Sequence, residues 1–376
     1  MKKRVLISAA EVSGDLHASG LMLELLKIDP RLEFFGLGGD KMAKAGCKLL
    51  YHAKQLSFMG FWEVLRNLNF IRRVRKNLLR ELDSSPCRLG ILVDYPGFNL
   101  KLAEELKKRN IPVIYYISPQ IWAWGAGRME KIKRLVEKVI VFFPFEKRLY
   151  DQHGVKSDFV GHPALEIARP SMSREEFFRK NNLDPSATYI GLLPGSRLQE
   201  IRQHLPVMLE TAGVLKSKIG NLQFLIAQAP GIEFDRIKSR IPAAFSARIL
   251  QHATYDIMAY SRFLIVKSGS GTVEAACIGT PFVVLYKMNP VSFAIARRVV
   301  KIPDVAMVNV LAGEKIVPEF IQQDAVPAKI APAVSDILSN PQRYADMKQK
   351  LSQVKAMLAS GCAYQKAAQT IAPYLI

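Results

Sequence analysis

The sequence repeats one local pattern along most of its length: a short apolar run, then a turn rich in Gly, Ser, Pro or Asp, then residues with helical spacing. Apolar runs bounded by turn residues are typical of buried parallel strands, and the following helix supplies the crossover that such strands require. We expect strands at Val5–Ala10, Phe34–Leu37, Leu89–Val93, Val113–Ile117, Val139–Phe143, Tyr189–Leu193, Leu222–Ala227, Phe263–Val266 and Pro281–Tyr286. Because both halves alternate in this way, the sequence predicts an α/β protein with two doubly wound, Rossmann-like domains facing each other across a ligand cleft.

The length of 376 residues and the hydrophobic content of 49% suffice for two cores of ordinary size. We expect an N-terminal domain at 1–165 and a C-terminal domain at 166–345, with the polar stretch Glu166–Ser186 as the linker. After Gly313 the pattern predicts only helices. The last of these, 346–376, are expected to pack on the N-terminal domain or on a partner subunit.

The charge is strongly basic: 53 Lys and Arg against 33 Asp and Glu give a net charge of +20, spread over both halves. This favours an anionic partner, which can be nucleic acid, an acidic lipid surface or a phosphorylated substrate. The cysteines lie far apart without metal-ligand spacing, which indicates a reducing compartment and no zinc. The first apolar run ends at Glu11, which favours a strand over an export signal, and the uncharged run Ile111–Gly127 contains prolines and falls short of the ~20 residues of a membrane span.

A turn with two glycines, Gly269 and Gly271, follows the expected strand of Phe263–Val266. These glycines allow a tight turn and a close approach to a ligand, and the start of the next helix favours a phosphate. Glu274 lies in a long uncharged run, and a buried carboxylate needs a hydrogen-bond partner such as a ribose hydroxyl. The turn therefore predicts a nucleotide site, with an ordinary strand-turn-helix carrying a surface Glu as the alternative. Neither a dinucleotide fingerprint nor a Walker loop is present, so the ligand class stays open at this point.

The turn Pro194-Gly-Ser-Arg197 opens a helix in the same half. Ser196 and Gln199 have the spacing of a capping box, and Ser196 need have no other role. The fork of the Arg197 guanidinium can bind a diphosphate through two hydrogen bonds.

Asp94 follows the apolar run Leu89–Val93, at the carboxyl end of an expected central strand. Pro96 and Gly97 should stiffen the loop and place Asp94 ahead of the next helix. A carboxylate in this position can act as a general base toward a substrate hydroxyl, or it can hold the loop through an Asx-turn.

Two other turns of the N-terminal half carry polar residues with two readings each. Ser13 and Asp15, in the turn after the first strand, can cap a helix or contact a ligand. His162 lies between Gly161 and Pro163, so it is either a catalytic base or a turn histidine.

The stretch Leu56–Leu82 combines an aromatic start with apolar residues at helical spacing. Between Glu63 and Glu81 every charged residue is basic, as in helices that lie on anionic lipid headgroups, although a helix packed on a core shows the same apolar stripe. The residues expected to contact a membrane or acyl chains are Phe58, Met59, Phe61, Trp62, Arg66, Arg72 and Arg73.

Several stretches together resemble one family, the lipid-A-disaccharide synthases, which are inverting glycosyltransferases with the GT-B fold. The matching stretches are Glu11-Val-Ser-Gly-Asp15, Ser57-Phe-Met-Gly-Phe-Trp-Glu-Val64, Val93-Asp-Tyr-Pro-Gly-Phe-Asn99, Ser118-Pro-Gln-Ile-Trp-Ala-Trp124, Leu193-Pro-Gly-Ser-Arg197, Ser268-Gly-Ser-Gly-Thr-Val-Glu274 and Asn309-Val-Leu-Ala-Gly313. Their order and spacing follow the family over most of the chain. Val12 stands where Thr or Ala is common, and Gly97 stands where some relatives have a second acidic residue, which concentrates the expected base function on Asp94.

The resemblance implies transfer of 2,3-diacylglucosamine from its UDP derivative to the 6-hydroxyl of 2,3-diacylglucosamine 1-phosphate (lipid X). The products would be UDP and a β-1,6-linked disaccharide 1-phosphate, an intermediate of lipid A and lipopolysaccharide biosynthesis. No cofactor or metal is implied, and no Asp-x-Asp pair occurs in the chain. The expected partner is an anionic membrane and not nucleic acid, the expected location is the cytoplasmic face of the inner membrane, and a homo-oligomer stays open.

The resemblance also implies roles for individual residues. Asp94 would be the catalytic base. Donor contacts would come from Ser196, Arg197, Ser268, Gly269, Ser270, Gly271, Thr272, Glu274 and Asn309. Contacts in the acceptor cleft would come from Glu11, Ser13, Gly14, Asp15, Asn99 and Trp122. One alternative is a UDP-GlcNAc 2-epimerase, which shares this fold but acts on a soluble sugar nucleotide and does not need a helix with aromatic and basic residues. The other is a non-enzymatic basic protein, which would give Asp94 and Glu274 no role.

Overall fold

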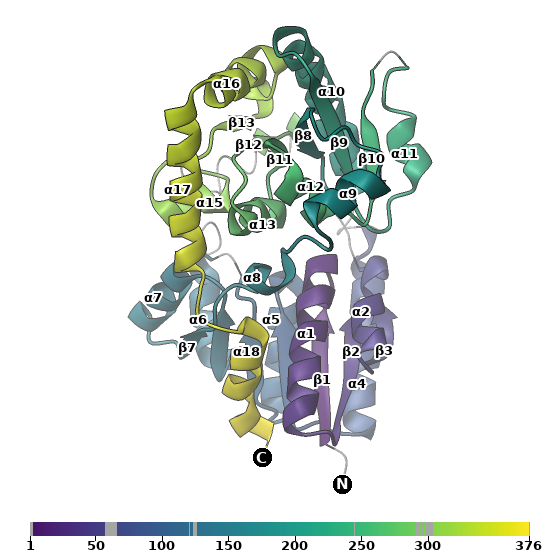
Figure 1. The fold of residues 1–376 in the computed structure, drawn as a ribbon. Coiled ribbons are helices and arrows are strands. Elements are labelled where there is room, and N and C mark those ends of the chain that lie inside the picture. Colours follow the sequence, from purple (N-terminus) through teal and green to yellow (C-terminus); the bar gives the residue numbers. More distant parts are fainter. Residues whose placement is uncertain are drawn as a thin grey trace. The chain divides into compact units, whose positions relative to one another are not determined.

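The computed structural model describes residues 3–56, 66–119, 121–122, 126–243, 245–290, 293–294, 297 and 304–375. The chain forms two compact units, each built around its own parallel sheet (Figure 1). Unit 1 comprises Met1–Pro163, Val299–Lys301 and Leu358–Ile376, and unit 2 comprises Ala164–Arg298 and Ile302–Met357.

Within the described residues, unit 1 has a seven-stranded parallel sheet with the strand order β3-β2-β1-β4-β5-β6-β7. The strands are β1 Lys3–Ala9, β2 Leu32–Gly38, β3 Lys48–His52, β4 Leu89–Val93, β5 Val113–Tyr116, β6 Lys138–Val141 and β7 Ser157–Phe159. Every predicted strand of this half is confirmed. The two edge strands β3 and β7 were not predicted, because edge strands are short and partly exposed and so lack a continuous apolar run.

Helices cover both faces of this sheet, as a doubly wound fold requires. They are α1 Val12–Ile28, α2 Asp40–Lys44, α4 Leu68–Ser84, α5 Pro96–Lys108, α6 Met129–Leu135, α7 Pro144–Gln152 and α18 Ala363–Ile371, with short 3₁₀ turns at Ala53–Gln55, Ala126–Arg128 and Ala372–Leu375. Alternate residues of one strand face opposite cores: Leu6 packs with α4 and α5, while Ile7 packs with α1 and α18. Among the described residues, no helix has both the length and the hydropathy of a membrane span.

Unit 2 has, within the described residues, a six-stranded parallel sheet with the order β10-β9-β8-β11-β12-β13. The strands are β8 Thr188–Leu193, β9 Leu222–Gln228, β10 Arg248–Gln251, β11 Phe263–Lys267, β12 Phe282–Tyr286 and β13 Glu319–Ile321. The expectation that only helices follow Gly313 is wrong, because β13 pairs with β12. A three-residue strand at a sheet edge is defined by this pairing and leaves no pattern of its own in the sequence.

The helices of unit 2 include part of the expected linker. They are α8 Ala164–Ile167, α9 Arg174–Lys180, α10 Leu198–Lys218, α11 Phe234–Lys238, α12 Thr254–Tyr260, α13 Ser270–Ile278, α15 Met307–Ala312, α16 Pro327–Ser339 and α17 Pro341–Met357, with a 3₁₀ turn at Gln322–Asp324. Phe177 and Phe178 on α9 are buried, and Ser171 donates its N–H and its hydroxyl to the two carboxylate oxygens of Asp256 on α12. The expected linker is therefore a packed part of unit 2, and its polar composition reflects the exposed side of α9.

The C-terminal residues are divided between the units. Helix α17 packs against α13, α15 and α16 of unit 2, whereas α18 lies along α1 in unit 1 (Figure 1). Gly20 on α1 allows this close approach, because a Cβ at this position would lie 2.8 Å from the Tyr364 ring. Lys3 Nζ donates to the carbonyl of Leu375 at 2.9 Å, which places the two ends of the chain side by side.

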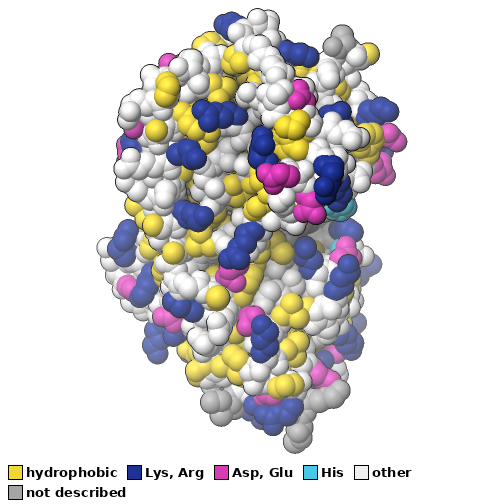
Figure 2. Space-filling view, in the orientation of Figure 1, with side chains coloured by type: hydrophobic (Ala, Val, Ile, Leu, Met, Phe, Trp, Pro, Cys, Tyr) yellow, Lys and Arg dark blue, Asp and Glu magenta, His cyan; other side chains and the backbone are white. Residues whose placement is uncertain are grey.

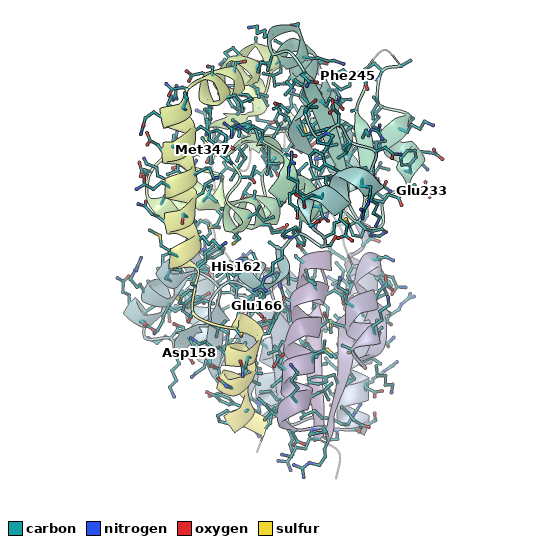
Figure 3. All side chains as sticks on the ribbon, viewed as in Figure 1. Asp158, His162, Glu166, Glu233, Phe245 and Met347 are labelled. Atoms are coloured by element: carbon teal, nitrogen blue, oxygen red, sulfur yellow. The ribbon has the colours of Figure 1, made fainter. Side chains whose placement is uncertain are left out.

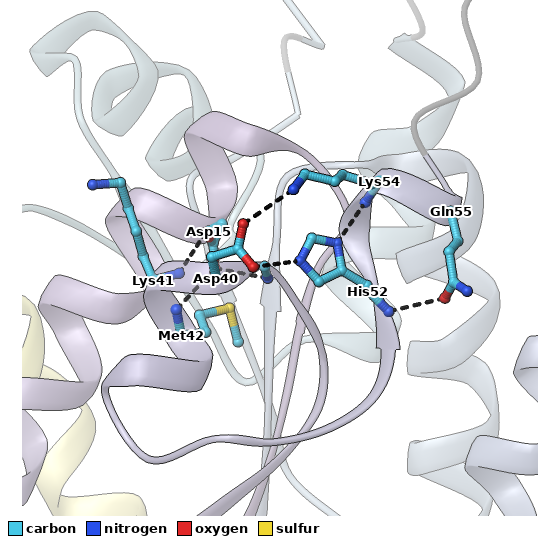
Figure 4. Close-up of polar contacts among 8 residues, drawn as sticks. Asp15, Asp40, Lys41, Met42, His52, Lys54 and Gln55 are labelled. Carbon is cyan, nitrogen blue, oxygen red and sulfur yellow. Dashed lines mark hydrogen bonds and ion pairs between the residues drawn. The ribbon is translucent and has the colours of Figure 1, made fainter. Parts of the chain in front are cut away.

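Asp15 joins α1 to the start of α2 (Figure 4). Its carboxylate is almost fully buried and accepts hydrogen bonds from the backbone N–H groups of Gly39 at 2.7 Å, Lys41 at 3.1 Å and Met42 at 3.0 Å. These amides belong to the first turn of α2 and have no partner within the helix. The neighbouring Asp40 is exposed and pairs at the surface with His52 and Lys54.

We predict that Asp15→Ala lowers the free energy of unfolding of unit 1 by about 3 kcal/mol, because the substitution leaves three buried amides without an acceptor. The matched control Asp40→Ala removes an acid from the same turn and should cost far less, because its ion pairs are exposed. All three tryptophans belong to unit 1, so tryptophan fluorescence during urea unfolding reports this unit. Equal losses for the two variants would contradict the capping role.

Candidate active site

The polar loops of unit 1 follow the carboxyl ends of adjacent strands. Residue pairs Ala9–Val93 and Val93–Tyr116 are in register across β1, β4 and β5, so these strands end at the same edge of the sheet. Glu11 comes two residues after the end of β1, and Asp94 comes directly after β4. Ligands of open parallel sheets bind at this edge.

Asp94 has an unusual backbone conformation. Its φ is +46°, and that of Tyr95, the residue preceding α5, is +47°. Left-handed backbone is uncommon for Asp and strained for a bulky residue such as Tyr, and such strain is found most often at functional sites. Asp94 stands ahead of helix α5, as expected, and Tyr95 is the N-cap. The expectation that Pro96 and Gly97 belong to a loop is wrong, because they form the first turn of α5, where proline is favoured.

The Asp94 backbone is held on both sides by buried groups. Its carbonyl accepts from Asn99 Nδ2 at 2.7 Å and from the Tyr115 hydroxyl at 2.7 Å, and its N–H lies 3.3 Å from the Tyr116 carbonyl. Asn99 also donates to the Val93 carbonyl, and its Oδ1 accepts from the Ser8 hydroxyl at 2.7 Å. These bonds fix the direction in which the Asp94 side chain leaves the sheet edge.

The surroundings of Asp94 favour a proton acceptor that works near neutral pH. Burial, and to a lesser extent the negative charge of Glu11, raises the pKa of Asp94 to about 6. A general base is most effective when its pKa lies close to the working pH.

Two residues predicted to contact the acceptor have structural roles instead. Asn99 is fully buried and binds the backbone around Asp94, and Asp15 is engaged at both oxygens by the start of α2. The prediction that they line a ligand site is therefore not supported by their contacts. Three other predicted acceptor residues lie at the start of α1. Glu11 is half-buried, Ser13 is exposed, and Gly14 is buried, where an added Cβ would lie 3.4 Å from the Ala9 Cβ.

Trp122 is held by a buried acid that was not predicted. Glu146 in the first turn of α7 is 4% exposed, and its Oε1 accepts from the Ser118 hydroxyl at 2.9 Å and from Trp122 Nε1 at 3.2 Å. Burial raises the pKa of Glu146 to about 7. The only signal in the sequence is an acid directly after Pro144-Phe145, at the start of a helix. Trp124 lies outside the described residues.

His162, labelled in Figure 3, is buried and is not an exposed base. Its ring contacts Phe142 and Phe143, and its backbone N–H donates to the Leu358 carbonyl at 3.0 Å. Burial lowers the pKa of His162 to about 3, and the nearby His17 acts in the same direction. Of the two readings, the structure supports the turn histidine, which holds the segment that leads into α18.

In unit 2, the turn after β8 is organised by another acid that was not predicted. Glu200 Oε2 accepts from the N–H of Ser196 at 2.9 Å and from the N–H of Arg197 at 3.3 Å. The predicted capping box of Ser196 with Gln199 is therefore wrong: the helix begins one residue later, and Glu200 supplies the reciprocal bond. Gly195 has a φ of +122°, and a Cβ there would lie 2.5 Å from the Glu200 carboxylate.

The turn after β11 has the predicted form. Gly269, with a φ of +147°, precedes the first residue of α13, and its carbonyl accepts from the Thr272 hydroxyl at 2.7 Å. Ser268 is buried and donates its N–H to the Leu285 carbonyl on the neighbouring strand. Ser268 and Thr272 thus hold the turn, while Ser270 is exposed at the helix start.

Glu274 is the carboxylate of this region that has no hydrogen-bond partner among the described residues. It lies on α13, and burial raises its pKa to about 7. Burial and the Glu274 charge together raise the pKa of Tyr255 on α12. A half-buried acid without a protein partner is costly, and a bound ligand with hydroxyl groups would offset this cost.

Asn309 was predicted to contact the donor, but its amide is saturated by the protein. The side chain is fully buried; Nδ2 donates to the Val317 carbonyl and to Glu319, and Oδ1 accepts from the N–H groups of Ile316 and Val317. The side-chain amide of Asn can donate two hydrogen bonds and accept two, and Asn309 makes all four. Asn309 thus fixes the chain that leads into β13.

The predicted membrane helix is described only from Arg66 onward, so Phe58, Met59, Phe61 and Trp62 lie outside the described residues. Helix α4 buries Val74, Leu78 and Leu82, whereas Arg66, Arg72 and Arg73 are exposed. The apolar stripe therefore packs on the core, and the basic residues face outward. Figure 2 shows Lys and Arg side chains over the surfaces of both units.

Comparisons with known proteins agree over nearly the whole chain. A family model described as lipid-A-disaccharide synthetase matches residues 5–372. A lipid-A-disaccharide synthase of Geobacter sulfurreducens is 38% identical over 359 residues, which cover 95% of this chain and 94% of that protein. One of Syntrophus aciditrophicus is 39% identical over 368 residues, which cover 97% and 96%.

Solved structures with low sequence identity share the fold. A UDP-GlcNAc 2-epimerase of Neisseria meningitidis bound to UDP-GlcNAc is 13% identical, with a TM-score of 0.63 and coverage of 100% of this chain and 99% of that chain. The calicheamicin glycosyltransferase CalG4 is 13% identical, with a TM-score of 0.64 and coverage of 100% and 98%. These similarities show the GT-B fold but do not separate epimerases from transferases, whereas the sequence relatives do. The chain belongs to the lipid-A-disaccharide synthase family, whose members are glycosyltransferases of lipid A biosynthesis.

Proposed function

We propose that this protein transfers 2,3-diacylglucosamine from UDP-2,3-diacylglucosamine to the 6-hydroxyl of 2,3-diacylglucosamine 1-phosphate. The products are the β-1,6-linked disaccharide 1-phosphate and UDP. The observation that carries this proposal is Asp94, a half-buried carboxylate with a raised pKa, fixed at the carboxyl end of a central strand. Membership of the family supplies the reaction class.

In the proposed reaction the acceptor 6-oxygen attacks the anomeric carbon of the donor sugar. Asp94 takes the proton of the 6-hydroxyl as the new C–O bond forms. The bond between the anomeric carbon and the diphosphate oxygen breaks, and its electron pair leaves with UDP. Attack from the side opposite to the leaving group inverts the configuration, which yields the β-linkage.

Unit 1 is the proposed acceptor domain, and unit 2 is the proposed donor domain. Glu274 would accept hydrogen bonds from the ribose hydroxyls, which gives its buried carboxyl group a partner. Arg197 and the start of α13 would stabilise the negative charge that develops on the leaving diphosphate, so the proposal requires no metal ion.

Acyl chains on both substrates place the reaction at a membrane surface. The exposed arginines of α4 and the net charge of +20 support contact with anionic headgroups. We propose a peripheral location on the cytoplasmic face of the inner membrane. The epimerase alternative is not favoured, because the epimerases share only the fold at 13% identity or less in the structures compared here, whereas the synthases are 35–39% identical.

We predict that Asp94→Asn, which keeps the shape of the side chain and removes the base, lowers kcat/KM by about 10²–10⁴-fold. Product formation from both substrates in detergent, with EDTA present, measures the effect. Unimpaired turnover by the variant would leave the proposed reaction standing but exclude Asp94 as its base. If the wild type converts UDP-GlcNAc alone and forms no disaccharide, the protein is an epimerase and the proposed transfer is excluded.

The acid limb of the pH profile tests the state of Asp94. Because the base must be unprotonated and its pKa is about 6, kcat/KM should fall about tenfold per pH unit below that value. Glu11→Gln removes a like charge and lowers the pKa of Asp94, so the acid limb should move to lower pH. Ser13→Ala, in the same turn, is the control and should leave the limb in place. A limb that does not move in Glu11→Gln would exclude the coupling of the two acids.

Membrane contact by α4 is tested with the double variant Arg72→Glu/Arg73→Glu. Each basic residue near an anionic surface contributes about 1 kcal/mol, so co-sedimentation with anionic vesicles should fall at least about tenfold. The double variant Lys216→Glu/Lys218→Glu changes the charge equally on exposed positions of α10 and should bind as the wild type does. Equal losses in both variants would indicate that net charge alone, and not α4, drives binding.

A further inference from the structure

A cluster of charged side chains in unit 2 lies between the turn after β8, which contains Gly195, and the turn after β11, which contains Gly269. Glu200 on α10 is 6% exposed, and its Oε1 lies 2.8 Å from Lys267 Nζ and 3.6 Å from the Arg197 guanidinium. Its other oxygen accepts from the backbone N–H groups of Ser196 and Arg197. Strands β8 and β11 are neighbours in the sheet, so the Glu200–Lys267 pair links the turn after β8 to the turn after β11.

Lys267 is the last residue of β11, and its ammonium group lies against the glycine turn. A Cβ on Gly269 would lie 3.3 Å from Lys267 Nζ. The ammonium also lies 5.8 Å from the centre of the Tyr286 ring. An ammonium group carries three N–H donors, and Glu200 is its one hydrogen-bond partner among the described residues. Donors of Lys267 therefore remain for a ligand at the turn.

Glu200 remains charged although it is buried. Burial opposes the charge, but Lys267, the Ser196 amide and Arg197 outweigh it and lower the pKa of Glu200. His204 supports the same turn of α10: its Nε2 accepts from the Lys287 N–H at 3.0 Å, so Nδ1 carries the proton and donates to the Glu200 carbonyl at 2.6 Å. The ion pair with Lys267 is thus held in place at neutral pH.

We propose that Lys267 donates hydrogen bonds to the diphosphate of the donor nucleotide, and that Glu200 is the positioning residue that holds Lys267 and Arg197 toward it. This inference rests on the proposed function, which supplies a UDP donor. With Arg197 and Lys267 positive and Glu200 negative, the cluster carries one net positive charge and attracts a diphosphate. The unpartnered carboxylate of Glu274, one helical turn into α13, marks the same turn as a ligand site.

The test measures the affinity for UDP and for uridine by titration calorimetry. In Lys267→Met the affinity for UDP should fall about 10–100-fold, the usual loss for one charge-assisted hydrogen bond, while the affinity for uridine stays within about threefold. Lys216→Met removes an exposed lysine of α10 and should bind both as the wild type does. Lys267→Arg keeps the charge and should retain most of the affinity for UDP. Circular dichroism confirms that each variant is folded.

Glu200→Gln tests the positioning role. It should weaken UDP binding in the wild-type background but have a smaller effect in the Lys267→Met background, because only Arg197 is then left for Glu200 to position. A purely structural residue would weaken UDP and uridine alike in both backgrounds, and this result would overturn the role of Glu200.

The possible failures are distinguishable. If the wild type binds UDP and folded Lys267→Met binds it equally well, the role of Lys267 is overturned and the proposed function stands. If the wild type binds UDP no better than uridine, the diphosphate contact is overturned. If the wild type binds neither UDP nor uridine, both the proposed UDP donor and the role of Lys267 are overturned.

Discussion

The left-handed backbone at Asp94 and Tyr95 is the constraint on which the site of unit 1 depends. This conformation is unfavourable for both residues and persists because Asn99 and Tyr115 bind the Asp94 carbonyl from the buried side. Asn99 is in turn fixed by Ser8 on β1. The position of one carboxylate therefore depends on side chains from three segments, β1, β5 and α5.

Four partly or fully buried carboxylates of this protein fall into two groups. Asp15 and Glu200 are saturated by backbone amides or by a lysine, and both join separate segments of the chain. Asp94 and Glu274 are less well compensated. The Tyr95 backbone N–H offsets the burial of Asp94 only in part, Glu274 has no hydrogen-bond partner among the described residues, and burial raises the pKa of each. The first group stabilises the fold, whereas the second retains a destabilising charge that only a substrate or a proton relieves. This difference in compensation separates structural acids from candidate functional acids better than their positions in the sequence do.

Much of the fold could be predicted, because continuous apolar runs mark the central strands and the turns after them contain Gly and Pro. The edge strands could not, since β13 is ordered by its pairing with β12 and not by its own residues. At the site, Asp94 and Glu274 could be selected because acids next to apolar runs are rare. Asn99 and Asn309 were assigned to ligands because a motif does not reveal that a side chain faces the backbone. Glu146 and Glu200 were missed because an acid in the first turn of a helix is ordinary, and only burial makes these two exceptional.

The return of the last helix to unit 1 has a consequence for how the chain folds. Ala367 and Ile371 of α18 belong to the same apolar cluster as Ile7 and Leu21, so residues from the two ends of the sequence complete one core. A core that needs both ends closes a loop of almost the whole chain, and such long-range closure is slow. During synthesis all residues of unit 2 emerge from the ribosome before α18. The part of the unit 1 sheet that α18 covers therefore stays exposed until α18 has emerged, although α1 already covers the rest of that face. The N-terminal half of this protein is therefore the last to be finished.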